Sequence, residues 1–268
     1  MTSMRMYLAL CPLLLCALSA VGQTAAEASP TAKDIVARLA ENNQRRGQLL
    51  LSYTGQREYH LLYTGFPGRR EANMVVEVKY QAPASKEFTV VSQSGSTFII
   101  NRVFKKLLET EKEAADQKGQ TRTALTEQNY SFELLGEEEL DGRPSYVLKV
   151  EPRTDNKLLY RGRIWVDAAD YAVARVEAEP AKRPSFWISK TVIHHTYRKV
   201  GEFWLPAQNE SSSDVRLGGH ARLSISYGEY KVSAASSYPL SRTARDLKDL
   251  PITAESVCCP LKPIRRED

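Results

Sequence analysis

The residues best suited to chemistry are few in this chain, and they are not grouped as a catalytic site requires. The 268-residue sequence has four histidines and four cysteines. It contains no Gly-x-Ser-x-Gly nucleophile elbow, phosphate-binding loop, His-Glu-x-x-His helix or Cys-x-x-Cys pair. The pattern therefore predicts that the chain is not an enzyme and has neither a catalytic residue nor a cofactor.

Two adjacent pairs come closest to a metal or redox site. His194 and His195 lie on a predicted strand, where neighbouring side chains point to opposite faces, so the two cannot chelate one metal without a bulge. Cys258 and Cys259 are vicinal, and such neighbours rarely bridge each other because of ring strain. We expect ordinary strand histidines, an unpaired cysteine tail and no metal site. The alternatives for the cysteines are cross-linking to a partner, or binding of a metal with ligands from elsewhere.

Apolar residues, rather than polar ones, form the candidate binding site. They alternate along predicted strands and form a stripe on a predicted helix. The predicted ligand-binding residues are Ile99, Val103, Phe104 and Leu107 on the helix, and Met74, Val76, Val78, Phe88 and Val90 on the strands. If the helix leaves space above the strands, these residues line a hydrophobic cavity that suits acyl chains. The alternative is that they pack as a solid core.

The elements that must position these residues are antiparallel strands and two helices. Helix signals occur from Thr31 to Gly47 and over residues 97–114, where charged residues cover the face opposite the apolar stripe. The strand-like runs have one apolar and one polar face, which is typical of an antiparallel sheet that is covered on one side. Short turn sequences such as Asp141-Gly142 predict a meander of hairpins. The long runs at residues 53–63 and 186–200 predict a strongly twisted, curving sheet.

The first residues predict a secretory signal peptide. Arg5 precedes an uncharged apolar run at residues 7–20, and Ala20 and Gly22 provide small residues for cleavage. We expect residues 1–22 to be removed, one domain at residues 23–232 and an irregular tail at residues 233–268. No later apolar run is long enough for a transmembrane helix. The expected mature chain is therefore an exported monomer without a transmembrane segment.

Composition excludes two further classes of protein. Hydrophobic residues make up 42% of the chain, which is enough to build a core and argues against disorder. The formal net charge is +5, and acidic runs such as Glu137-Glu138-Glu139 lie among the basic residues. No nucleic-acid partner is therefore indicated.

Four late strand-like segments carry a family resemblance: YRGRIWVD at 160–167, VARVE at 173–177, VGEFWLP at 200–206 and ISYGEY at 225–230. Together they resemble the LolA-like outer-membrane lipoprotein-sorting proteins of the bacterial periplasm, a superfamily of the LolA, LolB and RseB type. The resemblance implies a mostly β protein of the α+β class: a strongly curved antiparallel sheet, or unclosed barrel, with amphipathic helices covering its concave face. In this family an arginine tethers the helical lid, and no residue of this chain is assigned that role from the sequence.

Three hypotheses on function remain after this reading. The first is a periplasmic transport or chaperone protein that binds lipid or an acylated lipoprotein. The second is a periplasmic sensor or scaffold that binds a protein partner, such as a membrane-associated one, through the sheet or the C-terminal tail. The third is an exported hydrolase with an unrecognised site.

Overall fold

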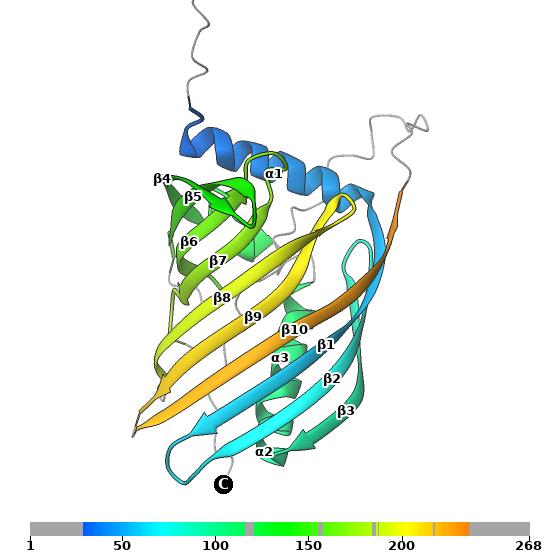
Figure 1. The fold of residues 1–268 in the computed structure, drawn as a ribbon, viewed down its shortest axis with the longest axis vertical. Coiled ribbons are helices and arrows are strands. Elements are labelled where there is room, and N and C mark those ends of the chain that lie inside the picture. Colours follow the sequence, from blue (N-terminus) through cyan, green and yellow to red (C-terminus); the bar gives the residue numbers. More distant parts are fainter. Residues whose placement is uncertain are drawn as a thin grey trace, which may run out of the picture.

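Ten antiparallel strands form one sheet in the computed structural model (Figure 1). The structure describes residues 29–115, 121–154, 158–183, 186, 188–216 and 218–235. The expected signal peptide at residues 1–22 and the Cys258-Cys259 pair lie outside the described residues.

The helices and strands follow the predicted periodicities closely. In chain order they are α1 (Ala32–Leu49), β1 (Leu50–Thr64), β2 (Arg70–Gln81), β3 (Ser85–Gly95), α2 (Thr97–Ile99), the π-helix η1 (Ile100–Phe104), α3 (Lys105–Ala114), β4 (Tyr130–Leu140), β5 (Arg143–Pro152), β6 (Tyr160–Asp167), β7 (Val173–Pro180), β8 (Ile188–Val200), β9 (Phe203–Val215) and β10 (Gly219–Ala234). Both predicted helices are present. The second consists of α2, η1 and α3 in succession, and a π-helical segment was not expected from the sequence.

The order of strands in the sheet is β3-β2-β1-β10-β9-β8-β7-β6-β5-β4. Strands that are consecutive in the chain therefore lie side by side, as a meander predicts, except for β3 and β4. In addition, β10 returns to pair with β1. The two edges are β3 and β4, and the chain between them contains the second helix. The sheet is thus an unclosed barrel whose opening lies where that helix is inserted into the chain.

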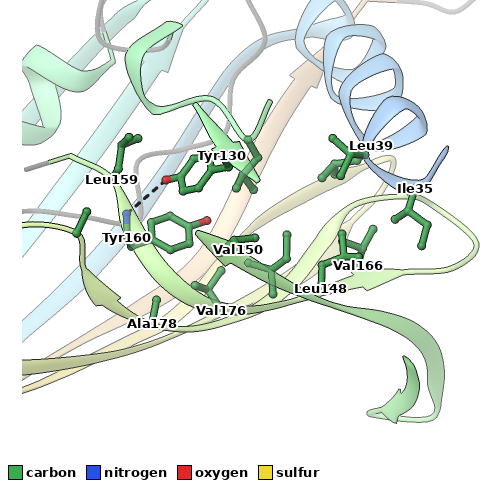
Figure 2. Close-up of a cluster of buried hydrophobic side chains, with 14 of the residues drawn as sticks. Ile35, Leu39, Tyr130, Leu148, Val150, Leu159, Tyr160, Val166, Val176 and Ala178 are labelled. Carbon is green, nitrogen blue, oxygen red and sulfur yellow. Dashed lines mark hydrogen bonds between the residues drawn. The ribbon is translucent and has the colours of Figure 1, made fainter. Parts of the chain in front are cut away.

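Helix α1 is fixed by its first turn and by its apolar face. Thr31 and Asp34 form a capping box, in which the backbone N–H of each donates to the side chain of the other at 3.1 and 3.3 Å. Ile35 and Leu39, which are four residues apart, lie on the same face and are fully buried. Figure 2 shows both side chains pointing from α1 toward the cluster that Val166 and its neighbours form on the sheet.

The C-terminal half of α1 is held by hydrogen bonds to the turn between β6 and β7. The Arg46 guanidinium donates to the backbone carbonyl oxygens of Asp170 at 2.8 Å and Tyr171 at 2.9 Å. The Arg38 guanidinium donates to the Tyr171 hydroxyl at 2.9 Å and lies against its ring. Charged side chains near both the middle and the end of α1 therefore bind it to the sheet's own turn.

The buried core is divided into two clusters, one beneath each helix. The first lies between α1 and strands β4 to β8, and Figure 2 shows it. The second lies between the α2–η1–α3 helix and strands β1, β2, β9 and β10. In Figure 1, α3 lies behind β10 and β1, against the inner side of the bent sheet, whereas α1 crosses one end of it. Each helix thus covers a different part of the apolar face.

We expect Leu39→Ala to lower the free energy of unfolding by about 2–5 kcal/mol, because the side chain is fully buried between α1 and the sheet. Leu51→Ala is the control, since Leu51 is 46% exposed and its truncation should cost less than about 1 kcal/mol. Urea unfolding of both variants measures the difference. Equal losses would show that α1 does not cover this core in solution.

Candidate functional site

The residues predicted to bind a ligand come together in the second core cluster. Val103 and Phe88 are partly buried at its margin. Six of the predicted residues are at most 5% exposed and contact one another within the cluster: Met74, Val76, Val78, Ile99, Phe104 and Leu107. The helix stripe and the strand face therefore meet, as their periodicities predicted.

Val90 is the predicted residue that the structure places outside this cluster. It pairs with the buried Val76 but is itself 42% exposed. The reason is local: β3 is an edge strand, and Val90 is its last residue in regular register with β2 before a bulge.

Residues 97–114, here named the cover helix, turn their apolar stripe toward the sheet. Ile100 and Phe104 lie in the π-helical segment and are both buried, and Leu107 and Leu108 continue the stripe into α3. A π-helical insertion shifts the phase of the residues that follow, and such insertions are frequent at functional sites. Here the phase brings Glu111, one turn beyond Leu107, to the same face.

Glu111 links the cover helix to the sheet through a buried cluster of charges. The Arg57 guanidinium on β1 donates from Nη1 to both Glu111 carboxylate oxygens, at 2.7 and 2.8 Å. The Lys86 ammonium on β3 lies 2.7 Å from Glu111 Oε1. Arg57 is 2% exposed and Lys86 5%, while the Glu111 side chain is 18% exposed. The carboxylate thus binds two strands that β2 separates.

Aromatic rings surround the two cations. The Arg57 guanidinium lies 4.7 Å from the centroid of the Tyr227 ring and 5.8 Å from that of Phe88. The Lys86 ammonium lies 5.9 Å from the centroid of Tyr53, which stacks on Tyr80 at 5.1 Å. Ring faces carry partial negative charge and attract cations, most strongly where water is excluded. These rings therefore stabilise the cations in a position that water hardly reaches.

The pKa values of the pair follow from this geometry. Burial alone would raise the pKa of the Glu111 carboxyl, but the Arg57 and Lys86 cations outweigh burial and lower it to about 2. Burial likewise opposes the charged form of Arg57, but the Glu111 carboxylate outweighs it and raises the pKa of the guanidinium above its usual value. Both groups are therefore charged at neutral pH.

The charge cluster was missed in the sequence, although a signal for it is present. Arg57 lies in the same strand phase as Tyr53 and Tyr59, whose side chains are buried. Lys86 has the phase of Phe88, and Glu111 follows the apolar helix stripe. A charged residue at an inward position of an amphipathic element has to find a buried partner, because an unpaired buried charge is costly. Charged residues at inward positions of three elements are therefore a sequence signal that could have predicted this cluster.

The Arg57–Glu111 ion pair, with Lys86 beside it, thus attaches the cover helix to the sheet, and it is here named the tether.

The histidines behave as their strand positions predicted. His194 is half exposed, whereas its neighbour His195 is 3% exposed and stacks on Tyr197 with ring centroids 4.4 Å apart. Within the described ranges, no group of three or more His, Cys, Asp or Glu side chains is arranged to hold a metal ion. Among these same residues, no helix combines the length and apolar composition that crossing a membrane requires.

We expect Glu111→Gln to lower the free energy of unfolding by about 3 kcal/mol, because it leaves the buried Arg57 and Lys86 cations without a carboxylate. Glu109→Gln on the same helix is the matched control. Glu109 is exposed and pairs with Lys106 at 2.9 Å, so its loss should cost less than about 0.5 kcal/mol. Urea unfolding at neutral pH measures both, and similar values for the two variants would contradict a buried tether.

The tether also predicts a pH dependence. The folded pKa of Glu111 is about 2, and an unfolded glutamate titrates near pH 4.3, so the tether stabilises the fold fully above the unfolded pKa. This contribution, about 3 kcal/mol, is lost as the pH falls from about 4.5 to about 2. The difference in unfolding free energy between the native chain and Glu111→Gln should therefore shrink across this window. A difference that stays constant down to pH 2 would show that Glu111 has an ordinary pKa.

Comparisons with known proteins give distant similarities. A family model described as an uncharacterized protein matches residues 107–238, and no curated protein matches the sequence. A DUF1329 family protein from Desulfovibrio piger is 12% identical at a TM-score of 0.39, over 76% of this chain and 94% of that one. An outer membrane lipoprotein-sorting protein domain from Vibrio parahaemolyticus is 12% identical at 0.36, over 72% and 90%. A LolA superfamily protein from Nitrosomonas europaea is 12% identical at 0.32, over 76% and 94%.

The TM-scores of these three solved structures all lie below 0.5. Ten antiparallel strands in an unclosed sheet, with helices against its inner face, confirm the fold class that the sequence predicted.

Proposed function

We propose that this chain is a binding or carrier protein for lipid or acylated molecules, which occupy the concave face of the sheet beneath a movable cover helix. The observation that carries the proposal is the way the cover helix is attached. Its underside is an apolar stripe on an apolar sheet face, and its charged contact to that face runs through Glu111. An acyl chain can replace the apolar contacts between helix and sheet at little cost in free energy, because hydrophobic contacts are non-directional.

The two helices differ in a manner that favours this division of roles. Arg46 binds α1 to backbone carbonyl oxygens of the β6–β7 turn, which belongs to the sheet itself. The cover helix is bound side chain to side chain, and it lies in the chain segment between the two unpaired edges β3 and β4. Its departure would break no ladder of the sheet. We therefore infer that α1 stays in place while the cover helix moves.

The cluster beneath the cover helix would then be the binding surface. Met74, Val76 and Val78 on β2 face Ile99 and Phe104 on the helix, and each is at most 3% exposed. In the closed state these residues form part of the core. When the helix moves away, the same residues present a continuous apolar surface that suits an acyl chain.

The compartment follows from the sequence rather than from the fold. We propose that residues 1–22 direct export and that residues 23–232 work in the periplasm, because the early apolar run has the layout of a cleaved signal peptide. Cargo in transit between membranes would need a shield for its acyl chains there, and the covered concave face supplies one.

Lipid extraction tests the proposal directly. Protein purified from its native compartment should release an acyl-containing molecule detectable by mass spectrometry, and it should bind a fluorescent fatty acid. Ligand should speed amide hydrogen exchange in residues 97–114 and leave that of α1 unchanged, because only the cover helix has to move. If no lipid is extracted and the fluorescent fatty acid does not bind, the carrier function is ruled out. Faster exchange in α1 alone would show that α1, and not the cover helix, is the part that moves.

A further inference from the structure

The Arg57 guanidinium retains hydrogen-bonding capacity that its partner leaves unused. Both Glu111 oxygens contact the same nitrogen, Nη1, so the carboxylate does not engage the side-by-side donor pair of the guanidinium. The Nε atom is buried and has no hydrogen-bond partner among the described residues. A buried N–H without an acceptor is costly, and most buried donors in proteins are satisfied.

The surroundings of this donor define what could satisfy it. Arg57 is 2% exposed, lies against the faces of Tyr227 and Phe88, and shares the Glu111 carboxylate with Lys86. Arginine binds carboxylates and phosphates most strongly through two parallel N–H donors, which the present contact does not use. An incoming acidic group can therefore bind Arg57 with better geometry than Glu111 does.

Glu111 is also placed so that it can be displaced. Its side chain is 18% exposed while those of both cations are nearly inaccessible, so Glu111 is the member of the cluster that is most accessible to solvent. A carboxylate that moves into water regains its hydration, whereas the cations remain buried and require an anion.

We propose that the ligand carries an acidic head group, a carboxylate or a phosphate, that binds Arg57 and Lys86 in place of Glu111 and thereby releases the cover helix. This inference rests on the proposed function and specifies its ligand class: an anionic amphiphile, whose apolar chain lies on the sheet face beneath the helix. Glu111 then acts as an internal mimic of the head group, which keeps the site closed until an acid competes for it.

The test compares amphiphiles that share one alkyl chain and differ in the head group. Palmitate, hexadecyl phosphate and the neutral hexadecanol are titrated against a fluorescent probe bound to the native chain at neutral pH. The acids should bind at least about tenfold more tightly than the alcohol, since each charge-assisted hydrogen bond contributes that much. The two acids distinguish the source: a preference for the phosphate indicates a phospholipid-like head group, and one for palmitate indicates a free fatty acid.

Three variants separate head-group recognition from loosening of the helix. Glu111→Gln removes the competitor and should tighten binding of the acids by about tenfold more than that of the alcohol. Glu109→Gln on the same helix should leave all three affinities unchanged. Lys86→Gln should weaken the preference for acids, and it serves as the second variant if Glu111→Gln does not fold. Circular dichroism confirms the fold of each variant.

The outcomes bear on the two proposals differently. Equal binding of acids and alcohol by the native chain and by Lys86→Gln would overturn the acidic head group and leave the lipid carrier intact. Failure of all three amphiphiles to displace the probe, or of the probe to bind, would overturn both. A preference for acids that disappears in Lys86→Gln supports the assignment.

Discussion

The structure depends on one constraint: a sheet with a single apolar face has to cover that face. Ten strands present more apolar inner surface than one helix can cover. Two helices cover it, and each lies above its own buried cluster. The contacts that attach each helix to the sheet differ, and we infer from them which helix stays in place and which one moves. The Arg46 guanidinium holds α1 to the backbone of a sheet turn, while the cover helix is held through a carboxylate that two buried cations share.

The periodic spacing of apolar residues in the sequence was enough to predict much of this architecture. Alternation along residues 74–80 and the stripe from Ile99 to Leu107 fixed which faces turn inward, because a strand repeats every two residues and a helix every 3.6. Val90 shows where such a prediction fails, since its exposure goes with the position of β3 at the edge of the sheet, which residue type does not encode. The pairing of β10 with β1 likewise depends on the assembled sheet, and no local signal in either strand encodes it.

The charge cluster was harder to foresee for a different physical reason. Arg57, Lys86 and Glu111 come from three elements spread over more than fifty residues, and each alone resembles a polar side chain on an exposed face. Only their common burial makes them a unit, and burial depends on where the cover helix lies. A search for charged residues in inward phase would have found all three, and their opposite signs would have suggested the pairing.

The place of β10 in the sheet has a consequence for how the molecule is assembled. Strand β10, the last of the described strands, occupies an interior position between β1 and β9, while β3 and β4 form the edges. It therefore joins β1–β3 laterally to β4–β9, although it follows all of them in the chain. Contacts so distant in sequence favour slow folding. Removal of β10 (Gly219–Ala234) would leave β1–β3 and β4–β9 with no strand between them, so the sheet would lose its centre rather than an edge.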